Sequence, residues 1–455
     1  MSGRERRVVL SGWGRAAPSA ASIERPTSPK GLVAILERAA RERRRVAARG
    51  LGRSYGDAAQ CAGGIVVDCT GLDQVLELDL GRRRIRVRAG ASLDALLRLL
   101  VPKGLFLPVT PGTRHVTVGG AIAADVHGKN HHRDGSFGAH VEELVLVSPT
   151  GRHVASRAAD PELLTATLGG LGLTGIVEEA TFSLVPIATS RLVVDTERAR
   201  DLEDLLARMA ERDDEYRYSV AWLDCLARGR HLGRGVLTRA DHAAREALGV
   251  GRRDPLAYDP RTRVSVPFPA PARLLNEVSV AAFNEAWYRR APRVRRGELQ
   301  SIPRFFHPLD GVGRWNLLYG RSGFTQYQFV VPFGAEEALR RVVERLASAR
   351  VPSFLAVLKR FGPSGEGHLS FPTPGWTLAL DLPLGRPGLA ALLDDLDEVV
   401  AEAGGRVYLA KDGRLRPDLI ASMYPRLESW RTLRRRVDPD GVLATDLARR
   451  LGLVP

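Results

Sequence analysis

The sequence predicts an α+β protein with two domains. The first 185 or so residues combine short strand patterns with long glycine-rich loops, and the middle of the chain shows the order strand, helix, strand, strand, helix. A chain of 455 residues is also long enough for two buried cores. We therefore expect an α+β domain at 1–189, a second domain with an antiparallel sheet and flanking helices at 190–405, and a C-terminal segment at 406–455.

Hydrophobic spacing and helix caps place the elements of the first domain. Residues 30–44 form an amphipathic pattern that follows Ser28 and Pro29, a cap and a first-turn proline, so we expect a helix there. Ser92 is the expected N-cap of a second helix, over 92–100. A third helix is expected near 161–168, and strands are expected at 46–49, 65–68, 75–78, 85–88, 144–147 and 176–184.

The second domain is less evenly patterned. Residues 226–300 are rich in arginine, proline and alanine and have weak periodicity, so we expect mobile loops there. The remaining elements are clearer. We expect helices at 202–211, 336–348 and 388–403, strands at 217–224, 326–331, 354–359 and 376–382, and a last strand at 406–409 that is followed by helices.

The composition is that of a soluble globular protein, with 44% hydrophobic and 26% charged residues, but the net charge is +15. Only five of the 67 basic residues are lysines. The arginines are scattered rather than clustered among aromatic residues, which argues against a nucleic-acid-binding protein. Three cysteines exclude a disulfide scaffold.

The sequence has no apolar run long enough for a membrane helix, and its N-terminus lacks the apolar stretch of a signal peptide. We expect a cytoplasmic protein or one peripheral to a membrane, and the periplasmic side is compatible with the sequence. The basic surface would favour an anionic bilayer.

A glycine-rich loop, G-L-G-R-S-Y-G, follows the strand at 46–49. Its spacing and the lack of a following helix do not fit a dinucleotide fingerprint, and no Lys-Ser/Thr follows as a P-loop requires. A nest of backbone N–H groups beside Arg49 and Arg53 would suit a pyrophosphate. A plain turn between two strands is the alternative, and this loop alone favours that alternative.

A second loop, over residues 111–138, is dense in small residues, which let the backbone approach a large flat ligand. Half of the ten histidines lie in or beside it. His127 and His131 are four residues apart, but Gly128 and Asn130 argue against a helix that would bring them together, so we expect no metal.

These two loops and several later motifs resemble the vanillyl-alcohol-oxidase-like flavoenzymes, and within them the branch of the decaprenylphosphoryl-β-D-ribose 2′-oxidases. The resemblance spans nearly the whole chain. It rests on SGWGR at 11–15, ARGLGRSYGD at 48–57, TPGTR at 110–114, VGGAIAADVHGKNHH at 118–132, GLTGI at 172–176, FFHPLD at 305–310, QYQFV at 326–330, LSFPTPGW at 369–376, YLAKDGR at 408–414 and MYP at 423–425.

The resemblance implies FAD in the first domain, to which the C-terminal segment returns. Some relatives tether the flavin through a histidine in the first loop, whereas Arg53 stands here, so we expect non-covalent FAD. The residues that the resemblance assigns to FAD are Ala48, Arg49, Gly50, Leu51, Gly52, Arg53, Ser54, Tyr55, Gly56, Asp57, Ala58, Gly112, Thr117, Val118, Gly119, Gly120, Ala124, Asp125, Val126, His127, Ile176 and Tyr408.

The resemblance also implies oxidation of the C2 hydroxyl of a polyprenylphosphoryl-β-D-ribofuranose to the 2-keto sugar, as the first half of an epimerisation for cell-wall arabinan, with an NAD(P)H-dependent keto-sugar reductase as partner. It assigns catalysis to Lys411, His127 and Tyr55. It assigns substrate binding to Lys129, Trp222, Tyr319, Gln326, Gln328, Ala379 and Lys411.

Each of these assignments has a plainer alternative. Lys411 could be a surface lysine paired with Asp412, and His127 could be a core histidine. Gln326 and Gln328 lie on one face of a strand, which either lines a wet pocket or is simply exposed. Ala379 stands where mycobacterial relatives have a cysteine, so no thiol adduct can form there. An FAD-dependent alditol or aldonolactone oxidase is the alternative function.

Overall fold

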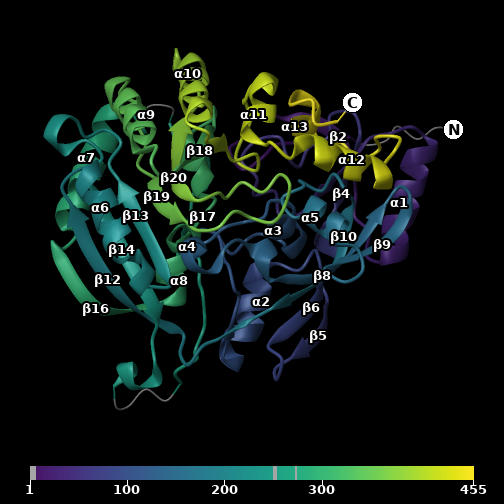
Figure 1. The fold of residues 1–455 in the computed structure, drawn as a ribbon, viewed down its shortest axis with the longest axis horizontal. Coiled ribbons are helices and arrows are strands. Elements are labelled where there is room, and N and C mark those ends of the chain that lie inside the picture. The colour runs from purple at the N-terminus through teal and green to yellow at the C-terminus, as the bar shows by residue number, and fades with distance from the viewer. Residues whose placement is uncertain (1–6, 250–253, 272–273, 455) are drawn as a thin grey trace.

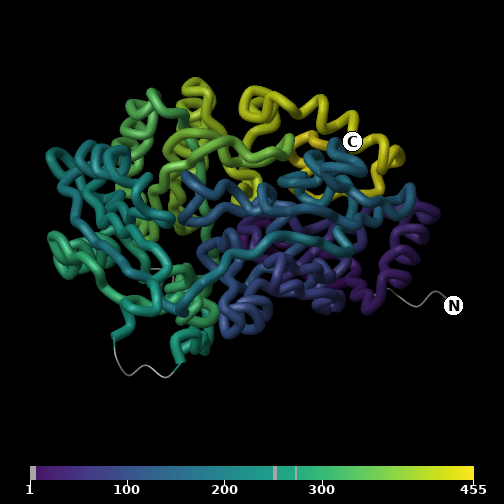
Figure 2. The backbone as a smooth tube through the Cα atoms, turned by 60° about the horizontal axis from the view of Figure 1, so that its bottom comes forward, coloured from purple at the N-terminus to yellow at the C-terminus, as the bar shows by residue number. Residues whose placement is uncertain are grey.

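The computed structural model describes residues 7–249, 254–271 and 274–454. The α+β class is confirmed, because two sheets with helices fill one half of an elongated molecule and a large antiparallel sheet fills the other (Figure 1). The N- and C-terminal segments lie at the same end of the molecule in both views (Figure 2).

The N-terminal half contains a four-stranded sheet and a five-stranded sheet. The first has the order β1-β2-β4-β3 and comprises β1 (Arg7–Leu10), β2 (Ser19–Glu24), β4 (Ile65–Asp68) and β3 (Val46–Arg49). The second is antiparallel, has the order β5-β6-β10-β8-β9, and comprises β5 (Val75–Asp79), β6 (Arg84–Arg88), β10 (Ile176–Ser183), β8 (Val141–Ser148) and β9 (Gly151–Ser156).

Helices and a small ribbon complete this half. The helices are α1 (Pro29–Arg41), α2 (Leu93–Leu100), α3 (Val118–Ala123), α4 (His131–Asp134) and α5 (Pro161–Thr167), and β7 (Leu105–Phe106) pairs with β11 (Val185–Pro186). Ser28 and Ser92 cap α1 and α2, as expected. Strands β3 and β4 pair in parallel although no helix joins them, so the connection between them is a long loop.

The other half is built on an eight-stranded antiparallel sheet with the order β16-β12-β14-β13-β19-β20-β18-β21. Its strands are β16 (Val294–Ser301), β12 (Arg191–Ala199), β14 (Gly235–His242), β13 (Tyr218–Leu223), β19 (Ala356–Phe361), β20 (Gly375–Pro383), β18 (Phe324–Pro332) and β21 (Arg406–Val407). A short pair, β15 (Val264–Ser265) and β17 (Val312–Gly313), lies outside it.

One face of this sheet is covered by helices. Leucines and valines of α6 (Leu202–Arg212), α9 (Glu336–Ser348) and α10 (Leu389–Glu402) share a hydrophobic core with the inward residues of β13, β18, β19 and β20. The expected antiparallel sheet with helices on one face is therefore confirmed. Because side chains alternate along a strand, the residues between the core positions face the opposite side.

The expectation of loops over 226–300 was wrong for 235–242 and for most of 277–300, whereas the described residues between them, 243–249, 254–271 and 274–276, are mainly loop. The segment forms β14, β16 and α7 (Glu277–Arg290). Only Val280 and Asn284 of α7 are buried, so its apolar residues do not gather in the stripe by which an amphipathic helix is detected. The cap was visible, since Asn276 and Ser279 form a capping box.

The end of the chain contacts both halves. β21 extends the large sheet beside β18, and α11 (Ile420–Met423), α12 (Leu427–Val437) and α13 (Asp446–Arg450) follow, while α8 (Ile302–Phe306) lies earlier, after β16. Val46 of β3 donates from its backbone N–H to the carbonyl of Val442 and forms a bridge with Leu443. The domain boundaries at 189 and 405 stay a prediction.

Candidate active site

A cavity of about 970 Å³ lies between the two glycine-rich loops and the sheet face that helices leave uncovered. It brings together most of the residues that the sequence assigned. Those that line it are Ala48, Arg49, Gly50, Leu51, Gly52, Arg53, Ser54, Tyr55, Ala58, Gly112, Thr117, Gly119, Gly120, Ala124, Val126, His127, Lys129, Ile176, Trp222, Gln326, Gln328, Ala379, Tyr408 and Lys411.

Two assigned residues, Gly56 and Asp57, lie behind the first loop rather than in the cavity wall. Gly56 packs so closely on the carbonyl oxygen of Asp412 that a Cβ there would lie 1.9 Å from it. Asp57 forms a two-pronged ion pair with Arg450, at 3.0 Å for each bond, and Arg450 also donates to Asp412 at 2.8 Å. These contacts join the first loop to the segment that carries Lys411.

Three further assigned residues also lie outside the cavity wall. Val118 is buried at the start of α3. Asp125 is buried and accepts a hydrogen bond from the Ser136 hydroxyl at 2.8 Å, which holds the second loop in shape. Tyr319 stacks on Phe324, with 4.1 Å between the ring centroids, behind the cavity floor.

The first loop forms a cradle with room for an anion. A Cβ on Gly50 would lie 2.2 Å from the Thr117 hydroxyl, so the loop touches the cap of α3, and Gly52 has a φ of +63°. Arg53 lies 3.8 Å over the ring of Trp13, and its buried Nε has no hydrogen-bond partner in the described residues. A glycine-rich cavity wall and an unpartnered guanidinium N–H suit a pyrophosphate, so these residues fit the FAD that the sequence implies.

The floor of the cavity is polar. Gln326 and Gln328 of β18 both face it, and Ala379 lies opposite Gln328 in the β18–β20 register. Gln328 donates to the Thr377 hydroxyl at 3.1 Å, and its amide nitrogen lies 3.0 Å from Nε2 of His127. The glutamine pair therefore lines a pocket and is not an exposed strand face.

His127 lies between Gln328 and Lys359, whose Nζ is 2.8 Å from Nδ1. With the Gln328 amide donating to Nε2, a neutral imidazole carries its proton on Nδ1 and donates it to the lone pair of a neutral lysine amine. Burial lowers the pKa of Lys359 to about 7, and burial together with the Lys359 charge holds the pKa of His127 well below its usual range. The Lys359 amine and the His127 imidazole are therefore a hydrogen-bonded pair that can take up and release a proton.

Lys411 lies beside Tyr55, with its Nζ 4.0 Å from the ring centroid. Burial lowers the pKa of Lys411 to about 8, against the pull of the Asp381 carboxylate. Asp381 accepts a hydrogen bond from Gln326, and burial raises its pKa to about 7. Lys411 is thus a cavity cation and not a surface lysine.

Sequence reasoning missed Lys359 and Asp381. Lys359 could have been found, because three of the five lysines, including Lys129 and Lys411, line this one cavity. Lys129 donates to the carbonyl of Phe305 and lies 4.2 Å over its ring, and burial lowers its pKa to about 7.

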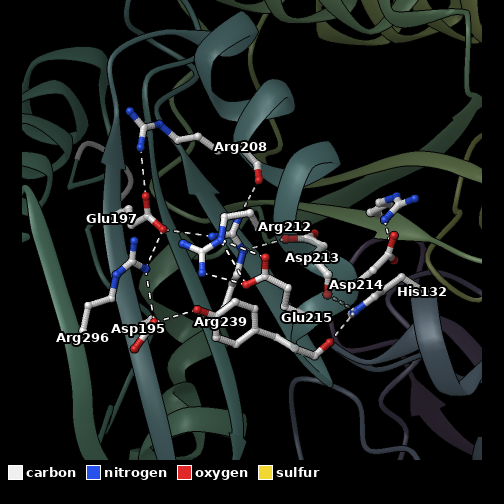
Figure 3. Close-up of polar contacts among 12 residues, drawn as sticks. His132, Asp195, Glu197, Arg208, Arg212, Asp213, Asp214, Glu215, Arg239 and Arg296 are labelled. Carbon is white, nitrogen blue, oxygen red and sulfur yellow. Dashed lines mark hydrogen bonds and ion pairs between the residues drawn. The ribbon is translucent and has the colours of Figure 1, made fainter.

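An ion-pair network stiffens the wall of the cavity in the second half of the molecule (Figure 3). Thr196 and Thr238 face the cavity, while their neighbours Glu197 and Arg239 point to the other side of the same strands and pair at 2.9 Å. His132 of α4 joins this network through the carbonyls of Asp213 and Tyr216, at 3.1 and 3.0 Å. The remaining labelled members in Figure 3 are Asp195, Arg208, Arg212, Asp214, Glu215 and Arg296.

The described ranges contain neither a cluster of metal ligands nor a helix that could span a membrane. No group of three or more histidine, cysteine, aspartate or glutamate side chains is placed to hold a metal ion. No helix there has the length and apolar character needed to cross a membrane.

Comparisons with known proteins agree with this geometry. The model of the FAD binding domain matches residues 20–157, and that of D-arabinono-1,4-lactone oxidase matches residues 336–451. The chain is 43% identical over 450 residues to the decaprenylphosphoryl-β-D-ribose oxidase of Mycolicibacterium smegmatis, which covers 98% of this chain and 97% of that protein.

Other relatives are an uncharacterized protein of Streptomyces coelicolor, 45% identical over 80% of this chain and all of that protein, and the L-gulono-1,4-lactone dehydrogenase of Mycobacterium tuberculosis, 24% identical over 97% and 99%. Because a 43% identity extends over nearly the full length of both proteins, and an FAD binding domain matches the first loop, this chain is an FAD-dependent oxidoreductase of the decaprenylphosphoryl-β-D-ribose oxidase family.

Proposed function

We propose that this protein oxidises the C2 hydroxyl of a polyprenylphosphoryl-β-D-ribofuranose to the 2-keto sugar. The supporting observation is that one cavity joins the anion cradle of the first loop to a floor of amides, a histidine–lysine pair and a second lysine. Amides suit sugar hydroxyls, and cations suit a phosphate. An NAD(P)H-dependent keto-sugar reductase would then consume the ketone.

The oxidation removes a hydride from C2 and a proton from its hydroxyl. Bound FAD supplies the hydride acceptor. FAD would be held by two loops and two further residues, either through direct contact or, for the buried members, because they shape the loops. These are the first loop, 48–58, the second-loop positions Gly112, 117–120 and 124–127, and Ile176 and Tyr408. Gln326 and Gln328 would orient the sugar, with Lys129 and Trp222 beside them in the cavity wall.

Lys359 and Lys411 would carry out the proton transfer and the charge stabilisation, respectively. The neutral amine of Lys359 would take the hydroxyl proton on its lone pair once the substrate hydroxyl replaces the His127 Nδ1–H there, and His127 would position the amine before the substrate binds. Lys411, held against Tyr55, would stabilise negative charge that develops at the reacting centre. Tyr319 would act indirectly, through the Asp381 carboxylate 3.4 Å from its hydroxyl.

The flavin is expected to be released when the protein is unfolded, because Arg53 cannot form the histidyl bond that tethers it in some relatives. Purified protein should be yellow, and acid precipitation should leave the flavin in the supernatant. A colourless purified protein would contradict the function, whereas a yellow pellet would contradict only the non-covalent binding.

A substrate comparison tests the reaction itself. Anaerobic addition of farnesylphosphoryl ribose should bleach the flavin, and xylitol or an aldonolactone should not. The alternative, an alditol or aldonolactone oxidase, draws support from the match over 336–451 and predicts the reverse.

The kinetic constants should depend on pH between 6 and 9. Lys129, Lys359 and Lys411 lose their protons as the pH rises through about 7 to 8, so the cavity loses positive charge. For an anionic substrate KM should therefore rise, while kcat should rise through about pH 7 as the base form of Lys359 appears and fall above about pH 8 as Lys411 loses its charge. Lys359→Met should remove the rise in kcat; a kcat profile that is the same in both proteins would contradict the assignment.

A further inference from the structure

Helix α7 exposes an unusual number of apolar side chains. Val278 is 77% exposed, Phe283 45% and Trp287 49%, and the rings of Phe283 and Trp287 stack with 6.0 Å between centroids. Leu274 before the helix and Val294 after it are also exposed. The helix is nevertheless anchored, because the buried Asn284 donates to Asp224 at 2.8 Å. A stacked aromatic pair held outward on a fixed helix marks an interaction surface.

The same surface is strongly basic. The sequence RRAPRVRR at 289–296 places five arginines at the end of α7 and the start of β16. Arg290 and Arg293 have no ion-pair partner in the described part of the chain. The acidic side chains nearby are engaged: Glu277 pairs with Arg350, Glu285 with Arg234 and Arg289, and Glu298 with Arg295 and Arg304.

This surface is continuous with the cavity. Trp287, Arg290 and Arg295 line both the cavity and the exposed face, and Arg304 joins them at the rim. In Figure 1, α7 and β16 lie at the end of the molecule opposite to the N- and C-terminal segments. An apolar and basic face around a cavity mouth has the composition of an interfacial membrane anchor, with aromatic residues for the acyl boundary and arginines for the phosphates.

We propose that α7 and the 289–296 segment dock the enzyme on an anionic lipid bilayer, with the cavity mouth against the membrane. The inference deepens the proposed function, because a polyprenyl substrate resides in a bilayer. Docking of this face would let a sugar phosphate enter the cavity while its lipid tail stays among the acyl chains.

Vesicle sedimentation tests the surface. The FAD-loaded full chain should sediment with vesicles of equal parts phosphatidylglycerol and phosphatidylcholine, and roughly tenfold less with phosphatidylcholine alone. The variants Val278→Gln/Phe283→Gln and Arg289→Gln/Arg293→Gln should each weaken sedimentation about tenfold or more. None of these four residues lines the cavity.

The matched controls lie in the turn between β5 and β6, where Leu80 is 55% exposed and Arg82 is exposed as well. Leu80→Gln and Arg82→Gln should sediment like the unaltered protein. The proposal would be overturned if the α7 variants sedimented like the unaltered protein or if the controls lost as much sedimentation as the α7 variants. Equal affinity of the unaltered protein for both kinds of vesicle would overturn it as well.

A soluble substrate separates this proposal from the proposed function. Flavin bleaching by farnesylphosphoryl ribose without vesicles should stay within about twofold in Val278→Gln/Phe283→Gln, because the change removes only contacts with lipid. If neither protein is bleached but vesicle binding still depends on α7, the proposed function fails and the docking surface stands. If the flavin of both proteins is bleached and the α7 changes do not alter vesicle binding, the docking surface is contradicted and the proposed function is not.

Discussion

Lys411→Met is expected to lower kcat by about 10²–10³-fold while FAD stays bound. Lys411 is a cavity cation held over the Tyr55 ring at 4.0 Å, and Asp381 draws it toward its charged form. Methionine fills the same space without the charge, so the loss concerns the transition state more than the packing.

Stopped-flow bleaching of the flavin measures this effect, since it isolates the reductive step. Lys103→Met, a change at an exposed lysine, is the matched control and should react at the unaltered rate. Flavin content and the thermal midpoint should match in all three proteins. Full turnover of Lys411→Met would contradict a catalytic role for this lysine and leave it only a role in packing.

Gly56→Ala should yield a protein without flavin. The added Cβ would lie 1.9 Å from the carbonyl oxygen of Asp412, and a backbone atom cannot move aside as a flexible side chain can. The first loop and the Lys411 segment must then separate, which we expect to lower the free energy of unfolding by about 1–3 kcal/mol or more.

Thermal unfolding and visible absorbance of the purified protein measure both losses. Gly311→Ala is the control, because a Cβ there meets no atom within 4 Å and its φ is not in the left-handed region. If Gly56→Ala retained flavin and the same midpoint as Gly311→Ala, the tight contact between the two segments would not matter for the cofactor.

The fold could be predicted where periodicity and capping agree. Ser28 and Ser92 mark the starts of α1 and α2, and the leucines and valines of α9 recur on one face. Helix α7 could not be found in that way, because its apolar side chains are mostly exposed and do not form an apolar stripe on one face of the helix.

The site could be predicted in part, because its loops are local in sequence. Gly50 to Tyr55 form one continuous stretch of the cavity wall, and its small residues were visible as a motif. The pairing of Lys359 with His127 could not be read from spacing, since 232 residues separate them. Asp381 lies two residues from Ala379 on β20, and this alternation alone would have placed it near the cavity floor.

The bond between Asp57 and Arg450 has a consequence for the order of biosynthesis. The two residues are 393 positions apart, and Arg450 also joins Asp412 to the same cluster. A growing chain therefore exposes the cradle of residues 50–55 long before the groups that brace it have been made. The cofactor should be captured only after translation has passed residue 450, so shortage of flavin would leave a fully synthesised apoprotein rather than a stalled intermediate.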